Sequence, residues 1–214
     1  MNATALAARD IRVTREGTTF FIDDVRVHLP LFGERFVAPA LDSIAADVTA
    51  GTPLAEAVAT AEREASAPRW VMQPLSPRPG VLVLNDASEA TPISTAMALK
   101  TLAELALDGS RSVAVLGELS EVGDDWRDEH DRIGRIVVRL NISKLVVVGD
   151  GARHIHNAAG LEGSWDGESV LVASAEEAYH LVGEDLRDGD VVLVKSSAAA
   201  GLGRLGDRLG GAAA

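Results

Sequence analysis

The feature that most constrains the fold is a rhythm that begins after Gly80. Short runs of β-branched residues and leucine recur there, and the stretches between them have the apolar spacing of helices. The runs are Val81–Leu84, Val113–Leu116, Leu145–Val148, Val170–Val172 and Val191–Val194. Solidly apolar strands that alternate with helices form a parallel sheet covered on both faces. We therefore predict an α/β domain with a doubly wound, mostly parallel sheet.

The stretches between these runs carry recognisable helix signals. The first begins with Thr91 as N-cap and Pro92 at the first helical position, an arrangement that favours a helix start. Further helices are expected over Arg127–Leu140, Ala152–Ala159, Ala175–Leu186 and roughly Gly201–Leu209. The final residues, Gly210–Ala214, are expected to form a frayed tail.

The first third of the chain has a different pattern. Apolar and polar residues alternate over Asp10–Leu31, which predicts two or three short antiparallel strands. Helical spacing follows over Phe36–Thr49, and a second helix is expected over Pro53–Glu64 with Thr52 as its N-cap. The breaker cluster Ser76–Gly80 indicates a linker or tight loop, and a domain boundary is expected within residues 66–80.

Composition excludes several classes of protein. The 214 residues are 47% hydrophobic, which suffices for a sizeable core, and the absence of cysteine rules out disulfides and thiolate chemistry. A formal net charge of −12 argues against a nucleic-acid partner. No apolar run approaches the ~20 residues of a membrane-spanning helix, and Met1–Leu6 lacks the start of a signal peptide. We expect a cytoplasmic protein without membrane insertion.

Ligands of doubly wound sheets bind at the carboxyl ends of the strands, so the polar residues after each run are the candidates. Asp86 follows a strand directly and can accept a hydrogen bond from a ribose or a cation, or form a turn. Lys195 ends an apolar strand, where lysine rarely lies without a partner. It can meet a carboxylate or phosphate of a ligand, or pair with Asp86. Further candidates are Asn85, Ser88, Gly117, Glu118, Glu121, Asp150, Ser174, Ser196 and Ser197.

Other motifs carry weaker signals. The sequence Gly149-Asp150-Gly151 matches only the start of a dinucleotide-binding fingerprint, because His154 stands where a third glycine is required. Turn glycines are predicted instead, which argues against a dinucleotide-dependent oxidoreductase. His154 and His156 do not share a helix face, so no metal site is predicted. The acidic run Glu118–Glu129 is either a solvated loop or a cradle for an ammonium group.

Three ordered motifs resemble the C-terminal portion of the Mur ligase family. They are Asn85–Ser94, Val113–Gly123 with His130 and Gly134 behind it, and Gly189–Ser197. The resemblance implies that residues 1–68 are a remnant of a central ATPase domain and that residues 69–214 form a Rossmann-like C-terminal domain. It also implies part of an ATP-dependent, amide-bond-forming ligase of peptidoglycan synthesis, which adds D-alanyl-D-alanine to a UDP-MurNAc-tripeptide through an acyl phosphate.

The resemblance also implies roles for single residues. Asp86 matches an aspartate that contacts the nucleotide ribose, and Arg69 matches an arginine that reaches the γ-phosphate. Substrate contacts are implied for Ser88, Glu89, Thr91, Glu121 and Lys195. ATP and Mg²⁺ are implied as cofactors, a small amine or dipeptide as substrate, and a P-loop-containing region or chain as partner. No residue is assigned a catalytic role.

This sequence departs from the family pattern within the first motif. Ser88, Glu89 and Thr91 stand where the family has a tyrosine and two asparagines, and no G-x-x-x-x-G-K-[ST] motif is present. Two hypotheses follow. The chain is part of a ligase that needs a P-loop region from elsewhere and is inactive alone, or it is a catalytically degenerate Mur-ligase-like module with a binding or regulatory role.

Overall fold

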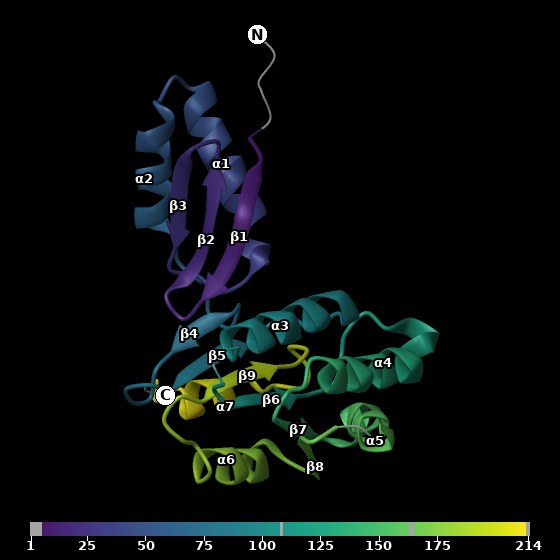
Figure 1. Ribbon diagram of the computed structural model, residues 1–214. Helices are drawn as coiled ribbons and strands as arrows, with labels where there is room; N and C mark the ends of the chain where they lie inside the picture. Colours follow the sequence, from purple (N-terminus) through teal and green to yellow (C-terminus); the bar gives the residue numbers. More distant parts are fainter. Residues whose placement is uncertain (1–5, 108, 163–164, 213–214) are drawn as a thin grey trace. The chain divides into compact units, whose positions relative to one another are not determined.

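The computed structural model describes residues 6–107, 109–162 and 165–212 (Figure 1). The chain divides into two compact units, Met1–Ala67 and Pro68–Ala214. The first five residues of Met1–Leu6, where no signal peptide is expected, and the last two of the expected tail lie outside the described residues. Each unit is described separately below.

The first unit is a three-stranded antiparallel sheet packed against two helices. The strands β1 (Ala8–Thr14), β2 (Gly17–Ile22) and β3 (Val25–Leu29) lie in this order, and the expected antiparallel strands are confirmed. Period-two alternation turns Phe20 and Ile22 of β2 to one face, where they pack with Ile44 of the helical layer. The helices are α1 (Val37–Thr49) and α2 (Leu54–Glu64), preceded by the 3₁₀ turn Glu34–Phe36.

The prediction that Thr52 caps α2 was wrong. Pro53 occupies the N-cap position, and no side chain there makes a capping hydrogen bond. The N–H of Thr52 instead donates to the Asp47 carbonyl oxygen at 3.0 Å, so Thr52 closes the end of α1. α2 begins one residue later than expected, and the Pro53 carbonyl oxygen accepts from the Glu56 and Ala57 N–H groups.

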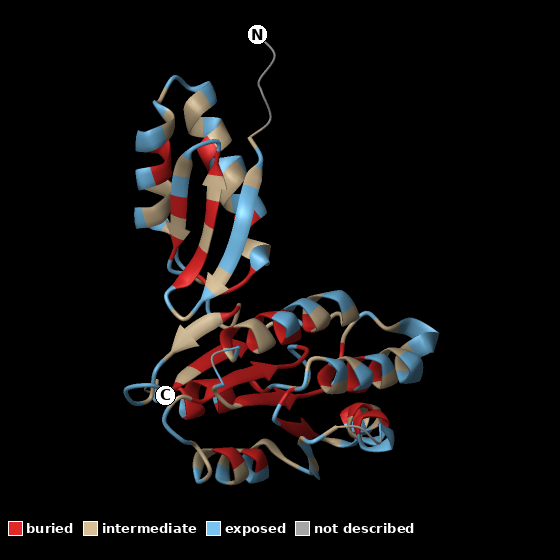
Figure 2. Cartoon of the chain, viewed as in Figure 1, coloured by how far each residue is buried: buried red, intermediate tan, exposed pale blue. Residues whose placement is uncertain are grey.

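The second unit contains a six-stranded sheet in the order β4-β5-β9-β6-β7-β8. Five strands are parallel, as the apolar runs predicted, and Figure 2 shows the strands in its centre as buried. The sequence did not predict the antiparallel edge strand β4, because Gln-Pro-Leu has no alternating pattern of its own. The bounds are β4 (Gln73–Leu75), β5 (Leu82–Asp86), β6 (Ser112–Leu116), β7 (Lys144–Val148), β8 (Glu168–Val172) and β9 (Val191–Lys195).

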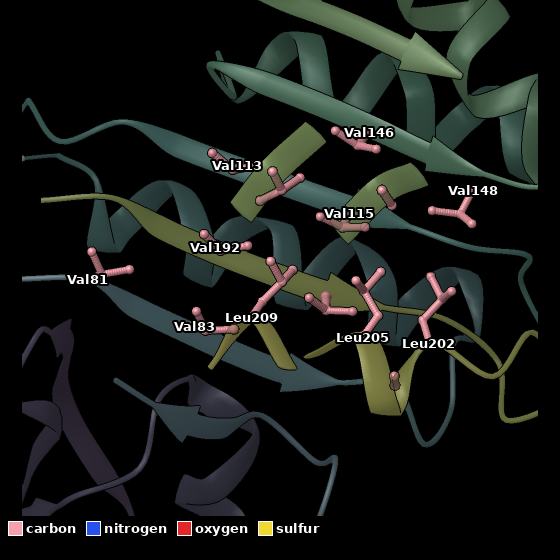
Figure 3. Packing of buried hydrophobic residues seen from close by; sticks show 14 residues of the cluster. Val81, Val83, Val113, Val115, Val146, Val148, Val192, Leu202, Leu205 and Leu209 are labelled. Atoms are coloured by element: carbon pink, nitrogen blue, oxygen red, sulfur yellow. The ribbon is translucent and has the colours of Figure 1, made fainter. Parts of the chain in front are cut away.

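Helices cover both faces of this sheet, which confirms the doubly wound α/β class. On one face, α6 and α7 pack on a cluster of valines that includes Val113, Val146 and Val192 (Figure 3). On the other face, α3 lies against β9 and β6, α5 lies against β7 and β8, and α4 packs between them. The helices are α3 (Pro92–Leu105), α4 (Trp126–Arg139), α5 (Arg153–Leu161), α6 (Ala175–Gly183) and α7 (Gly203–Leu209), with 3₁₀ turns at Gly123–Asp125 and Asp150–Ala152.

Strands β6, β7 and β8 are added in one direction across the sheet, and after β8 the chain crosses back. This change of direction locates the expected ligand-binding region. It returns through α6 to insert β9 between β5 and β6. The connection after β5 runs over one face through α3, and the connection after β9 runs over the other through α7. Such a topological switch point is where doubly wound sheets bind ligands, outside the carboxyl ends of the strands. Here those ends are Asp86 and Lys195.

Local signals explain several helix ends. Thr91 caps α3 by accepting from the Ser94 N–H at 3.1 Å, and Pro92 follows at the first position, as predicted. The expectation of a frayed tail was wrong for Gly210–Ala212. Their N–H groups donate to carbonyl oxygens of α7 and complete its C-terminus. Within the described part of the chain, no helix is both long and apolar enough to cross a membrane.

Candidate functional site

The strand ends Asp86 and Lys195 form a buried ion pair at the switch point. They are register partners on β5 and β9, and Lys195 Nζ lies 2.6 Å from Asp86 Oδ2. Both side chains are 1% exposed. The sequence left two partners open for Lys195, an acidic group of a ligand or Asp86, and in the structure Lys195 pairs with Asp86.

Each member of this pair makes a further hydrogen bond inside the protein. Lys195 Nζ donates to the Glu89 carbonyl oxygen at 2.8 Å, and the Met72 N–H donates to Asp86 Oδ1 at 2.9 Å. Each charge is thus satisfied by groups of this chain, as a buried ion requires. The pair joins β5, β9 and the segment that precedes β4.

Arg69 lies at a separate cluster with Asp207 of α7. Its guanidinium donates to Asp207 Oδ2 at 2.9 Å and lies 4.8 Å from the centre of the Trp70 ring. The Trp70 indole N–H lies 3.1 Å from both carboxylate oxygens of Asp207, and Asn85 Nδ2 donates to Oδ1 at 3.0 Å. Asp207 therefore collects three donors, while the Arg69 side chain keeps 69% of its surface exposed.

The structure does not bring Arg69 and Asp86 to a common side-chain cluster. Successive residues of a strand point to opposite faces, so Asn85 turns to α7 and Asp86 turns away from it. The two expected nucleotide residues are linked through the main chain instead, because the Met72 N–H bonds to Asp86. Sequence reasoning missed Asp207, whose contact with Arg69 spans 138 positions and leaves no local pattern.

The β5–α3 loop holds three of the expected substrate residues in different states. The Thr91 hydroxyl is engaged as the α3 N-cap, and the Ser88 N–H donates to the Trp70 carbonyl oxygen at 3.1 Å. The Glu89 side chain is exposed, while its carbonyl oxygen is held by Lys195. Glu89 therefore presents an exposed carboxylate at the carboxyl ends of the strands, while Lys195 holds its main chain in place.

The loop after β6 is tied to the neighbouring strand ends by consecutive hydrogen bonds. The Gly117 N–H donates to the Lys195 carbonyl oxygen, the Glu118 carbonyl oxygen accepts from Ser197, and the Ser120 N–H donates to Ala90, each at 2.9 Å. Only glycine fits at position 117, because a Cβ there would lie 2.8 Å from the Ser196 Cβ. Glu121, the next expected substrate residue, follows this loop with an exposed side chain.

His130 fixes the same loop from α4 through both nitrogens of its ring. Its Nε2 accepts from the Leu119 N–H at 3.1 Å, so its Nδ1 carries the proton and donates to the Trp126 carbonyl oxygen at 2.6 Å. Burial lowers the pKa of His130 and favours this neutral form. His154 pairs with Asp131 at 3.3 Å. No group of three or more potential metal ligands occurs among the described residues.

A network of ion pairs lies at the amino ends of the strands, across the sheet from the strand ends Asp86 and Lys195. Arg111 lies 2.7 Å from both Asp190 and Asp185, and Lys144 Nζ lies 3.1 Å from Asp185. The hydrogen bond from Arg111 lowers the pKa of the Asp185 carboxyl well below its usual range. These charges lie at the amino ends of the strands and neutralise one another, which is typical of a structural role.

Proteins of one family are similar to this chain. The family model described as Mur ligase, glutamate ligase domain, matches residues 69–198. A UDP-N-acetylmuramoyl-tripeptide–D-alanyl-D-alanine ligase of Mycobacterium leprae is 39% identical over 86% of this chain and 38% of its own length. The protein of the same name from Mycobacterium tuberculosis is 37% identical over 97% of this chain and 48% of its own length. The chain thus spans about half or less of these relatives.

Solved structures share the fold of the chain. MurF from Acinetobacter baumannii has a TM-score of 0.79 at 22% identity and covers 98% of this chain, which matches 46% of that protein. MurF from Thermotoga maritima in complex with ADP has a TM-score of 0.76 at 18% identity, with coverages of 96% and 47%. At these identities the likeness concerns the fold alone.

The motifs, the fold and the relatives all support membership of one family. The sequence motifs resembled the C-terminal portion of one family, and the family model matches the unit that contains them. The mycobacterial relatives extend the match over most of the chain. This chain therefore belongs to the Mur ligase family.

Proposed function

We propose that the chain is the C-terminal part of an ATP-dependent ligase that adds D-alanyl-D-alanine to a UDP-MurNAc-tripeptide. The observation that supports this most is the identity of 37–39% to relatives of that name over most of the chain. Residues 1–68 are proposed to be the end of the central ATPase domain, and residues 69–214 the C-terminal domain. The P-loop would come from a region or chain outside this sequence. The ligation reaction is proposed to take place in the cytoplasm.

The nucleotide is proposed to bind near Arg69 and Asp86. Arg69 suits a phosphate because its guanidinium is largely exposed and is already oriented by Asp207 and Trp70. A fold relative was solved in complex with ADP, which is in keeping with this assignment. Mg²⁺ is proposed to bind together with the nucleotide phosphates.

The amine substrate is proposed to meet the loops after β5 and β6, through Ser88, Glu89, Thr91, Glu121 and Lys195. Among these, Glu89 and Glu121 are exposed carboxylates that can attract an ammonium group, while Lys195 and Thr91 support the loop from within. In the proposed reaction the ammonium group first loses a proton to solvent, and the neutral amine attacks the carbonyl of an acyl phosphate. A C–N bond forms, the C–O bond to phosphate breaks, and the nitrogen gives up a second proton as phosphate leaves. The chain contributes by orienting the amine and stabilising charge in the tetrahedral intermediate.

Calorimetric titration of the full chain with ATP–Mg²⁺ and with D-alanyl-D-alanine tests this proposal. We expect saturable ATP binding that Arg69→Ala weakens by about tenfold or more, because a charge-assisted phosphate contact is lost. Arg78→Ala is the matched control, since Arg78 is also exposed but lies in the β4–β5 loop beside Asp188. Equal affinities of the two variants would contradict the assignment of Arg69.

A second candidate function is a degenerate module that binds a partner or regulates it. The observation that favours it is the replacement of a tyrosine and two asparagines of the family motif by Ser88, Glu89 and Thr91. This candidate predicts binding of both ATP and D-alanyl-D-alanine only at millimolar concentrations or weaker. Submillimolar binding of either ligand would contradict it.

A further inference from the structure

We propose that the outer face of the sheet in the first unit is a docking surface for an acidic segment of another protein. This surface, the basic face, consists of Arg9, Arg12, Phe21, Arg26 and His28 on the strands β1, β2 and β3. Figure 2 shows β1 as exposed over most of its length. The residues proposed to bind nucleotide and amine belong to the second unit, so this inference does not depend on the proposed function.

Strand alternation and register place the first row of these side chains on one face. Phe20 and Ile22 of β2 are buried on the inner face of the sheet. Phe21 lies between them in the sequence and therefore points to the outer face. The register pairs Phe21 with Arg9 of β1 on one side and with Arg26 of β3 on the other. Two arginines thus flank one aromatic ring on the outer face.

A second row of outer side chains lies beside the first. Thr19 of β2 is the register partner of Arg12 on β1 and of His28 on β3. The Thr19 hydroxyl lies 3.2 Å from His28 Nδ1, so these two side chains share a face. Residues that are directly opposite in an antiparallel pair point to the same side, which adds Arg12 to this row.

A β-bulge brings Arg9 and Arg12 to the same face. Two strand residues that are three positions apart normally point to opposite faces, because side chains alternate. The register between β1 and β2 shifts between Arg9 and Arg12, which inserts one extra residue into β1. Asp10 in this bulge has a φ of 53°, a left-handed conformation that is unfavourable for residues other than glycine. A locally strained backbone therefore collects both arginines on one surface.

The positive charges of the basic face are only weakly compensated by the residues that the structure describes. Arg12 and Arg26 are exposed, and neither forms an ion pair with any of those residues. Arg9 lies 3.9 Å from Asp24, but both side chains are mostly in solvent, where such a pair contributes little. A partner that carries carboxylates would relieve the repulsion between the arginines.

Charge favours a short acidic protein segment as the occupant of the basic face. The chain has a formal net charge of −12, so its remaining surface repels long polyanions such as nucleic acids and anionic membranes. A short segment can contact the basic face alone and meet only its local positive charge. Arginine forms strong charge-assisted hydrogen bonds with carboxylates, and the partly exposed Phe21 offers an apolar centre between them.

A titration of the full chain followed by fluorescence anisotropy tests the charge preference. The probe is a fluorescein-labelled peptide of alternating glutamate and tyrosine, and the neutral control peptide has glutamine in place of glutamate. We expect saturable binding of the acidic peptide only, weakened about tenfold when the salt concentration rises from ~50 to ~300 mM. Equal affinities for the two peptides would overturn the inference.

The double variant Arg12→Gln, Arg26→Gln locates the binding on the basic face. Arg63→Gln is the matched control, because Arg63 is an exposed arginine of the same unit on α2, which packs against the inner face. All three side chains are exposed, so circular dichroism should show an unchanged fold. We expect the double variant to bind the acidic peptide about tenfold more weakly and the control to bind within about twofold of the original chain. The inference fails if the double variant binds as tightly as the control.

The same double variant distinguishes other occupants, each of which would contradict the proposal. Tighter binding of a single-stranded oligonucleotide or of anionic phospholipid vesicles than of the acidic peptide, abolished by the double variant, would identify a different class of partner. A dimer in sedimentation experiments that the double variant dissociates would identify a second copy of this chain. Absence of ATP binding would refute part of the proposed function and would leave the inference about the basic face intact.

Discussion

Replacing Gly134 by alanine tests the packing of α4 on α5, which supports His130 and the loop it holds. A Cβ at position 134 would lie 2.3 Å from the Ile155 carbonyl oxygen and 2.9 Å from the Ala158 Cβ. The carbonyl cannot swing aside, so the helices must separate, which costs about 3 kcal/mol. Alanine is favoured over glycine in a helix by roughly 1 kcal/mol. We expect a net loss of about 2 kcal/mol in the free energy of unfolding.

Gly160→Ala on α5 is the matched control, because a Cβ there meets nothing within 4 Å. This variant should gain about 0.5 to 1 kcal/mol from helix propensity alone. Urea unfolding followed by tryptophan fluorescence reports on the second unit, since Trp70, Trp126 and Trp165 all belong to it. If Gly134→Ala were as stable as Gly160→Ala, the close approach of α4 to α5 would be refuted.

Three further predictions concern single side chains. Thr91→Ala should lower stability by about 1 kcal/mol through loss of the α3 N-cap, and Thr91→Ser should retain most of it; thermal unfolding checks both. Burial lowers the pKa of His130 in the folded protein. Its contribution to the free energy of unfolding is therefore complete above the unfolded pKa of ~6.5 and decreases as the pH falls below that value. His130→Asn should therefore flatten the decline in urea midpoint between about pH 7.5 and 5.5, and an unchanged decline would contradict this. The lowered pKa of Asp185 predicts stability that is lost as the pH falls below about 4, and Asp185→Asn should remove that loss from acid titrations followed by circular dichroism.

The α/β class could be predicted because the central strands are buried on both faces. Their apolar runs, such as Val191–Val194, are local and continuous, and the following segments carry helix signals such as Thr91-Pro92. The strand β4 could not be predicted, since its three residues pair only because β5 supplies an edge. The cap at Thr52 was mispredicted because α2 begins one residue later, with Pro53 at the N-cap position.

The candidate site could be predicted in location but not in its internal partners. Strand ends follow from the runs, so Asp86 and Lys195 were identifiable, and their pairing was one of the alternatives considered. The role of Asp207 depends on α7 folding back over β5 to meet Arg69 and Trp70. Such contacts between residues far apart in the sequence leave no periodic signal in the chain.

Reconstituted ligation tests the central claim most directly. The full chain is mixed with the part of the Mycobacterium tuberculosis relative that it does not cover, together with ATP–Mg²⁺, UDP-MurNAc-tripeptide and D-alanyl-D-alanine. Phosphate release and the joined product are measured, with each component omitted in turn. We expect product only when both protein parts and the dipeptide are present, and Arg69→Ala in this chain should abolish it. No product from the mixture, with both parts folded, would contradict the claim that this chain supplies the C-terminal part of such a ligase.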